Sequence, residues 1–230
     1  MSDFFDDITS VLQARWRMPD APMDAIELIS RKYNVPEIIA RILHTRGIPE
    51  DKIESFLRPT LSRDFPDPFA LHAMKETAEY LADALQQKRK IFIFGDFDVD
   101  GATSSAILAR FLRHFGLEAP IYIPGRLTEG YGPNIEAFKS FKDQGAEIVV
   151  LLDCGTTAFD PVQAARDMGL EIVILDHHEA EERLPAVNHL INPKQACDQS
   201  GFTMLAACGV TFLTCIAINK ILREQGYFKN

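Results

Sequence analysis

Several kinds of segment are missing from this sequence of 230 residues, and each absence narrows the class of protein. The first seven residues are acidic and lack the basic start, apolar stretch and cleavage site of a signal peptide. The longest nearly apolar run, 204–218, is shorter than the ~20 residues that span a bilayer, so we expect a buried helix there and no membrane association. The four cysteines form no C-x-x-C pair, which favours a reduced, cytoplasmic protein whose cysteines pack as small core residues.

Three common catalytic or phosphate-binding motifs are also absent. No G-x-G-x-x-G follows a predicted strand, and no G-x-x-x-x-G-K-[ST] occurs, which weighs against dinucleotide-binding and P-loop proteins. No serine stands in a G-x-S-x-G turn. Any chemistry on phosphates must therefore come from other residues.

The balance of charge neither supports nor excludes a nucleic-acid ligand. The net charge of −9 argues against one, but two divalent cations would cancel four of those charges where the acids are densest. Basic residues are grouped at 88–90 and at Arg110 with Arg113. Such groups are more typical of a solvated helix surface than of a DNA contact.

The organisation changes near residue 70. Apolar residues recur at helical spacing in 26–33 and 38–42, and a short helix is expected at 53–57. Three prolines then interrupt regular structure: Pro59, Pro66 and Pro68. We therefore predict a small helical N-terminal region, residues 1–70, followed by a main domain, residues 71–230.

In the main domain, short apolar strands alternate with helices. The predicted strands are 91–94, 121–123, 148–152, 172–175 and 187–191, and the predicted helices are 72–87, 105–115, 135–144, 161–168 and 204–222. Apolar strands in this alternation predict an α/β fold, with a parallel, doubly wound sheet covered by helices on both faces.

Acidic or imidazole side chains follow three of these strands: Asp96, Asp98 and Asp100, then Asp153, then Asp176, His177 and His178. Because the carboxyl ends of parallel strands lie along one edge of a sheet, we expect these side chains to converge. Carboxylates packed in a partly desolvated cleft repel one another, so a proton or a cation must compensate. Carboxylates with imidazoles suit Mn²⁺, Mg²⁺ or Fe²⁺, and two such ions about 3.5–4 Å apart can clamp a phosphoryl group. The sequence therefore predicts a metal site.

Each motif also has a simpler interpretation. Asp153 before Gly155 could cap a helix, and a pair of histidines is commonly a surface or core feature. Asp98 to Gly101 also fits the D-x-D-G pattern of haloacid dehalogenases, in which the first aspartate is phosphorylated. That family does not require the Asp-His-His run at 176–178, so it ranks behind the metal site.

The motifs together resemble one known family. Residues 95–104, GDFDVDGATS, are similar to the G-D-[YF]-D-x-D-G-x-T-S motif of RecJ-type DHH phosphoesterases. Asp153-Cys154-Gly155 resembles their second acidic motif, and Asp176-His177-His178 is the run that names the superfamily. Residues 124–132 are similar to their P-x-R-x-x-E-G-Y-G segment, and Ile191-Asn192-Pro193 and 209–212 also match the expected pattern.

The resemblance implies roles for individual residues. Two divalent ions, Mn²⁺ or Mg²⁺, would be held by Asp98, Asp100, Asp153 as the bridge, and His177. Catalytic or substrate-side roles would fall to Asp96, Asp176 and His178, with Arg126 as a substrate phosphate contact. A water activated by the metals would then attack single-stranded DNA from its 5′ end and release 5′-mononucleotides. Single-strand-binding protein or a helicase would be further partners of a full-length enzyme.

The resemblance implies that RecJ-type proteins continue beyond the last residues of this sequence, and that a further metal-ligating aspartate follows the long helix that closes it. We therefore expect a shortened domain that binds metal weakly and has little processive nuclease activity. Two alternatives stay open. One is a DHH phosphodiesterase acting on short oligonucleotides or cyclic dinucleotides, and the other is a non-catalytic DHH scaffold.

Overall fold

The computed structural model describes residues 11–14 and 19–228, and the chain divides into two compact units, 1–66 and 67–230. The first unit consists of helices and a 3-10 turn: α1 (Met23–Tyr33), α2 (Glu37–Thr45), the turn Glu50–Lys52, α3 (Ile53–Leu57) and α4 (Leu61–Asp64). Its small core contains Ile26, Leu43 and Ile53, which are all almost completely buried.

Helices α1, α2 and α3 lie where the apolar spacing predicts them, whereas α4 was not predicted, and α2 buries a different face. Ile38 and Ile42, two of the apolar residues whose helical spacing predicts α2, are 53% and 42% exposed. Ala40 and Leu43 are buried instead. The spacing of apolar residues thus located the helix without identifying its inner face.

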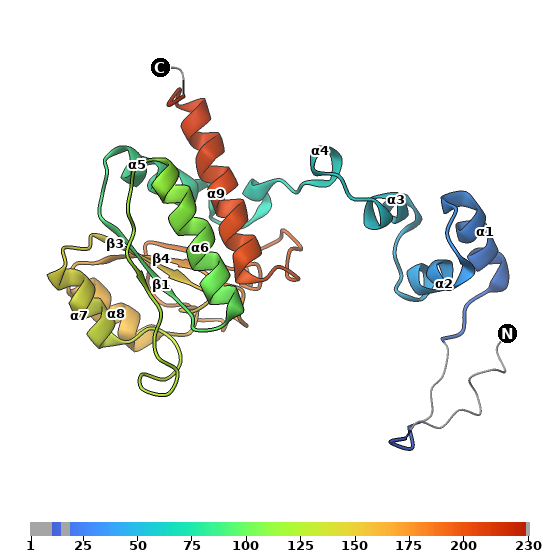
Figure 1. The fold of residues 1–230 in the computed structure, drawn as a ribbon, viewed down its shortest axis with the longest axis horizontal. Helices are drawn as coiled ribbons and strands as arrows, with labels where there is room; N and C mark the ends of the chain where they lie inside the picture. The colour runs from blue at the N-terminus through green and yellow to red at the C-terminus, as the bar shows by residue number, and fades with distance from the viewer. Residues whose placement is uncertain (1–10, 15–18, 229–230) are drawn as a thin grey trace. The chain divides into compact units, whose positions relative to one another are not determined.

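The second unit contains a five-stranded parallel sheet in the order β2-β1-β3-β4-β5 (Figure 1). Its elements along the chain are a 3-10 turn (Pro68–Ala70), α5 (Met74–Gln86), β1 (Ile91–Gly95), α6 (Val99–His114), β2 (Ile121–Tyr122), α7 (Ile135–Asp143), β3 (Ile148–Leu152), α8 (Phe159–Asp167), β4 (Glu171–Leu175), β5 (His189–Ile191) and α9 (Ala207–Glu224). The predicted α/β class with a parallel, doubly wound sheet is confirmed.

Helices cover both faces of the sheet. On one face, alternate strand residues pack against α7 and α8: Phe92, Phe94, Val149, Leu151, Ile172 and Ile174. The opposite face lies against α5, α6 and α9 (Figure 1). In this strand order the chain reverses direction across the sheet between β1 and β3, and ligands of such folds bind at the carboxyl ends of those strands.

The register of the strands sets three aspartates at one level. Gly95 pairs with Leu152, and Leu152 pairs with Leu175. The next residue after each strand end is an aspartate, and its N–H donates to the neighbouring strand: Asp96 to Leu152 at 3.1 Å, Asp153 to Leu175 at 3.1 Å, and Asp176 to Ile191 at 3.0 Å. The ladder therefore continues through the aspartates and fixes their backbones side by side.

Two helices of the main domain begin three or more residues away from their predicted starts. α6 starts at Val99 rather than at residue 105, because the Asp98 carboxylate accepts hydrogen bonds from the N–H groups of Asp100 and Gly101 and caps the helix. α9 starts at Ala207 rather than at Met204, which is 77% exposed. No helix in the described parts of the chain is long and apolar enough to cross a membrane.

The four cysteines only partly follow the expectation of core packing. Cys154 and Cys215 are buried, whereas Cys208 is half-buried and Cys197 is exposed. All four are free thiols.

Gly101 is the third residue of α6 and lies against the backbone of Asp96. A Cβ at this position would come within 2.4 Å of the Asp96 carbonyl oxygen and 2.6 Å of its nitrogen. We expect Gly101→Ala to destabilise the fold by ~1–3 kcal/mol, because backbone cannot yield as a side chain does. Gly209 is the matched control, since it is the third residue of α9 and its Cβ would meet only the Leu205 side chain, at 3.1 Å. Urea unfolding should leave Gly209→Ala within ~1 kcal/mol of the unaltered chain, and equal losses for the two variants would contradict the packing described.

Candidate metal centre

The turn after β1 supplies two carboxylates that are already used as helix caps. One oxygen of Asp98 accepts from the N–H groups of Asp100 at 2.8 Å and Gly101 at 3.0 Å, and the bond from Gly101 lowers the pKa of Asp98. The two oxygens of Asp100 accept from the N–H groups of Ala207 and Cys208, both at 2.7 Å. These N–H groups open α9 and have no partner within the helix. Asp100 therefore joins α6 to the start of α9.

Asp153 and Asp176 are the two most deeply buried carboxylates of the group. Asp153 follows β3 with a positive φ of 61° and is 1% exposed. Burial, the charge of Asp100 and the hydrogen bond with Asp98 raise the pKa of Asp153 to about 8. The alternative in which Asp153 caps a helix is wrong, because α8 begins only at Phe159.

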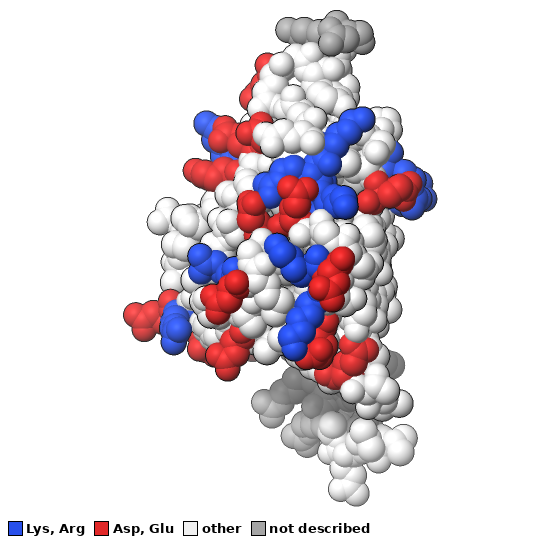
Figure 2. All heavy atoms as spheres, turned by 90° about the vertical axis from the view of Figure 1, so that its left-hand side faces the viewer, with Lys and Arg blue, Asp and Glu red and all other residues white. Residues whose placement is uncertain are grey.

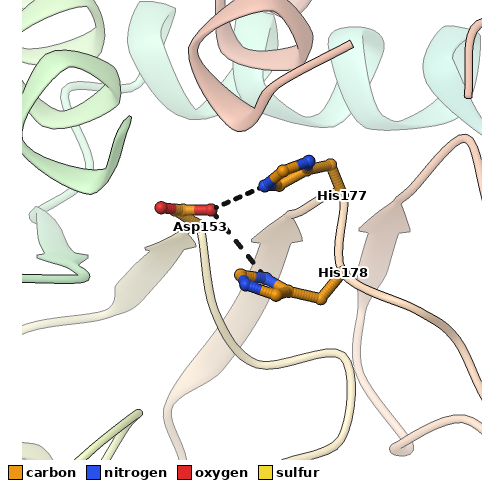
Figure 3. A group of neighbouring side chains, drawn as sticks. All are labelled: Asp153, His177 and His178. Atoms are coloured by element: carbon orange, nitrogen blue, oxygen red, sulfur yellow. Dashed lines mark ion pairs between the residues drawn. The ribbon is translucent and has the colours of Figure 1, made fainter. Parts of the chain in front are cut away.

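Two histidines from the end of β4 turn toward Asp153 (Figure 3). The Asp153 Oδ1 atom lies 3.2 Å from His177 Nε2 and 3.8 Å from His178 Nδ1. His177 Nε2 also lies 3.5 Å from Asp100 Oδ2. His177 thus faces two of the acids, whereas His178 approaches the cluster through the nitrogen nearer its backbone.

Potential ligand atoms gather in two overlapping groups. Asp153, His177 and His178 form one, and Asp96, Asp98 and Asp153 form the other, each with its ligand atoms within 4.8 Å of one another. Among the described residues, Asp96 Oδ1 and Asp153 Oδ1 are buried without a hydrogen-bond partner. Burial also raises the pKa of Asp96. Buried carboxylate oxygens without partners, beside an imidazole, fit a hard divalent cation such as Mn²⁺ or Mg²⁺.

Asp176 differs from the other acids because its oxygens are already occupied. They accept from Thr156 N at 3.1 Å and Oγ1 at 2.6 Å, from the backbone N–H groups of His177 and His178, and from His178 Nδ1 at 2.7 Å. Burial opposes its ionisation, but the hydrogen bonds from His178 and Thr156 lower the pKa of Asp176 to about 2. Asp176 lies behind the cluster and holds the turn that carries both histidines.

The segment 124–132 approaches the same turns through aromatic side chains. The Arg126 guanidinium lies over the ring of Phe97, 5.2 Å from its centre, and Phe97 meets Tyr131 edge to face. The Tyr131 hydroxyl is 3.1 Å from His178 Nε2. Glu129 braces the segment by accepting from the Gly125 N–H at 2.9 Å and from the Tyr122 hydroxyl. Arg126 is exposed and sits next to the β1 turn.

Three residues that contact Asp176 or His178 were given no role from the sequence: Tyr131, Thr156 and Asn192. Tyr131 and Asn192 stand in motifs that match the family pattern, so a signal existed without a function attached to it. Thr156 carries no such signal. Its importance depends on a hydrogen bond to a residue twenty positions later.

Comparison with known proteins identifies the family of this chain. The profile of the DHH family, N-terminal domain, matches residues 90–226, more than half of the chain. The chain belongs to the DHH family. The family expected from the sequence motifs is thereby confirmed.

The similar proteins include several exonucleases. The DHH chain is 34% identical over 198 residues to the single-stranded-DNA-specific exonuclease RecJ of Bacillus subtilis (strain 168), covering 86% of this chain and 25% of that protein. A crystal structure of exonuclease RecJ bound to manganese is 31% identical with a TM-score of 0.60, covering 66% of this chain and 38% of the other. RecJ from Thermus thermophilus in complex with Mn²⁺ has a TM-score of 0.69 over 88% of this chain and 28% of the other, and at 24% identity it shows the fold alone. The chain spans about a quarter to a third of the length of the curated relatives it matches.

The raised pKa of Asp153 predicts how stability depends on pH when a chelator removes metal. The folded state holds this proton up to about pH 8, whereas an ordinary aspartate loses it near 3.8, so stability falls as pH rises between these values. One such group contributes a slope of at most ~1.4 kcal/mol per pH unit. The raised pKa values of Asp96 and His178 also make stability fall as pH rises. The lowered pKa values of Asp98 and Asp176 change stability only at lower pH. In thermal unfolding measured across this pH range, the stability of Asp153→Asn should fall less steeply with pH than that of the unaltered chain. The exposed Asp143→Asn should keep the slope of the unaltered chain. Stability of the unaltered chain that rises with pH between these values would contradict the assignment.

The bonds from Asp100 to α9 predict a local effect of its removal. In Asp100→Ala the N–H groups of Ala207 and Cys208 lose their acceptor, so their hydrogen exchange should accelerate, with a loss of ~0.5–2 kcal/mol in stability. Hydrogen exchange of the two amides, measured with Asp143→Ala as an exposed control, checks this. Unchanged exchange at both positions would show that Asp100 does not hold the start of α9.

Proposed function

We propose that this chain carries the two-metal centre of a 5′→3′ single-stranded-DNA exonuclease. The observation that carries the proposal is a pair of buried carboxylate oxygens at the β1 and β3 ends, one of Asp96 and one of Asp153, that have no hydrogen-bond partner among the described residues. A cation held by Asp153 would satisfy its unpartnered oxygen and offset the repulsion between the two carboxylates. Phosphodiester hydrolysis is the chemistry that paired divalent ions at such an edge support.

The proposed ligands are Asp98, Asp100, Asp153 and His177. Asp153 would bridge the two ions, because it lies in both groups of ligand atoms. Asp98 and Asp100 would each serve one ion while keeping their bonds to the helix starts, since a carboxylate oxygen has a second lone pair. The capping bonds fix both carboxylates before any metal arrives, which lowers the cost of forming the site.

When bound, the ions would supply the polarisation of the phosphate and the activation of water. The protein's own residues would do the rest. Asp96 would stay at the back of the cluster as a buried carboxyl whose burial raises its pKa. His178, with Asp176 behind it, would face the substrate side next to Tyr131. Arg126 would contact a phosphate of the substrate, with its guanidinium held over Phe97.

Single-stranded DNA is the proposed substrate because the relatives in the comparison are named as nucleases specific for it. The surface charge does not itself favour a strand of DNA. The net charge is −9, and the face in Figure 2 shows basic and acidic side chains intermingled, without a continuous basic track. Binding would therefore depend on the metals, Arg126 and the aromatic rings of Phe97 and Tyr131 rather than on a basic surface. We also propose single-strand-binding protein or a helicase as partners, and the cytoplasm as the location.

Metal binding tests the proposal directly. Calorimetric titration with Mn²⁺ should give two equivalents for the unaltered chain, and Asp153→Asn should bind at least ~10-fold more weakly, a loss of ~1.4 kcal/mol. Asp143→Asn, an exposed aspartate at the end of α7, is the matched control and should bind as the unaltered chain does. A chain that takes up no Mn²⁺ would contradict the proposed centre.

The same samples separate the candidate substrates. A 5′-labelled single strand should release labelled mononucleotide in the presence of Mn²⁺, while the corresponding duplex and the 3′-labelled strand should not release label at the start of the reaction. Faster cleavage of dinucleotides than of long strands would favour the oligonucleotide phosphodiesterase instead. Mn²⁺ binding without any cleavage would favour the scaffold.

A further inference from the structure

A chain of hydrogen bonds behind the cluster begins at Asn192, which is completely buried at the end of β5. Its Oδ1 accepts from the backbone N–H of Lys194 at 2.9 Å. Because a backbone N–H can only donate, the oxygen of the amide must face Lys194 and the NH₂ group must face the other way. The NH₂ group then donates to Thr156 Oγ1 at 3.0 Å and to the His178 carbonyl at 2.9 Å.

The orientation of Asn192 determines where the hydroxyl hydrogen of Thr156 points. Thr156 Oγ1 accepts from Asn192, so its own hydrogen is free to donate to Asp176 Oδ2, which lies 2.6 Å away. Thr156 and Asp176 are each 1% exposed, so water does not compete for these groups. Asp176 Oδ2 consequently accepts two hydrogen bonds, one from the hydroxyl and one from the N–H of Thr156.

The acceptor character of Asp176 then fixes the ring of His178. The Asp176 Oδ1 atom accepts from the backbone N–H groups of His177 and His178 and lies 2.7 Å from His178 Nδ1. With Asp176 accepting throughout, Nδ1 must carry a hydrogen. In the neutral ring Nε2 is therefore the bare nitrogen, and it accepts from the Tyr131 hydroxyl at 3.1 Å.

We infer that Asn192 and Thr156 are positioning residues that hold Asp176 and thereby set the tautomer of His178. The ring keeps its Nδ1 hydrogen on Asp176 and presents Nε2 to Tyr131. His178 is then not a metal ligand through Nδ1, although that atom lies 3.8 Å from Asp153 Oδ1 and His178 belongs to one group of potential metal ligands. His177 alone supplies imidazole to the ions.

The inference deepens the proposed function and rests on it only for the effect on catalysis. Asp176 and His178 would act at the substrate side, and Tyr131 would hold the ring at the nitrogen that faces the substrate. A partner of this kind behind a functional group typically changes activity ~10- to 100-fold when removed. The tautomer itself does not depend on any bound ion.

Long-range ¹H–¹⁵N correlation spectra of the histidine rings test the tautomer in the metal-free chain. We expect His178 to carry hydrogen on Nδ1 in the unaltered chain, and Asp176→Ala, which removes the acceptor of that hydrogen, to abolish the preference for Nδ1. A bare Nδ1 in the unaltered chain would overturn the inference.

Thr156 offers a matched pair of variants for the positioning role. Thr156→Val keeps the shape but removes the hydroxyl, so Asp176 loses one donor and Asn192 loses one acceptor. The exchange of the His178 Nδ1 hydrogen with solvent should accelerate ~10-fold, which corresponds to ~1.4 kcal/mol. Thr156→Ser retains the hydroxyl and should restore the slow exchange. Equal exchange rates in the valine and serine variants would refute the role of Thr156.

Titration with Mg²⁺ in the same spectra separates this inference from the proposed function. The ring resonances of His177 should shift when the ion is added, while His178 should keep its hydrogen on Nδ1. If His177 does not respond, the proposed metal centre fails and the tautomer stands. If Mg²⁺ displaces the hydrogen from His178 Nδ1, the inference fails and the metal centre stands.

Discussion

The register of three neighbouring parallel strands is the constraint on which the functional region depends. β1, β3 and β4 end at the same level, and each is followed by an aspartate whose N–H continues the hydrogen-bond ladder. The backbones of Asp96, Asp153 and Asp176 cannot move apart without breaking this ladder. The sheet therefore forces acids together, and the surrounding structure must compensate for their repulsion.

The compensation differs from one carboxylate to the next. Asp98 and Asp100 lie at the starts of α6 and α9, where free N–H groups and the helix dipole favour negative charge. Asp176 is saturated by five hydrogen bonds and has a pKa lowered to about 2. Asp96 and Asp153 each keep a buried oxygen without a hydrogen-bond partner among the described residues, and their pKa values are raised. The unmet demand for positive charge is thus concentrated between the ends of β1 and β3, where the order of the strands favours a ligand.

Much of this arrangement could be predicted from the sequence, because strand ends and charged residues are local features. The apolar run 148–152 coincides with β3, and the parallel sheet brings its following aspartate next to that of β1. The start of α6 could not be predicted in the same way, because the acids that suggested a ligand-binding loop also cap a helix. Asp176 resembles the other acids in sequence, but the saturation of its oxygens depends on Thr156, which lies twenty residues earlier in the chain. The tautomer of His178 depends on a chain of contacts that only the folded structure brings together.

The edge formed by β1, β3 and β4 is proposed to hold two cations on Asp153, with His177 and not His178 as the imidazole ligand. Anomalous diffraction at the manganese edge, from crystals of the chain grown with Mn²⁺, would locate the ions and their ligands in one experiment. We expect two peaks about 3.5–4 Å apart that share the Asp153 carboxylate as a ligand. One of the two ions should bind His177 Nε2, and His178 Nδ1 should stay within hydrogen-bond distance of Asp176. Absence of anomalous density at Asp153, or a peak bound to His178 Nδ1, would contradict this arrangement.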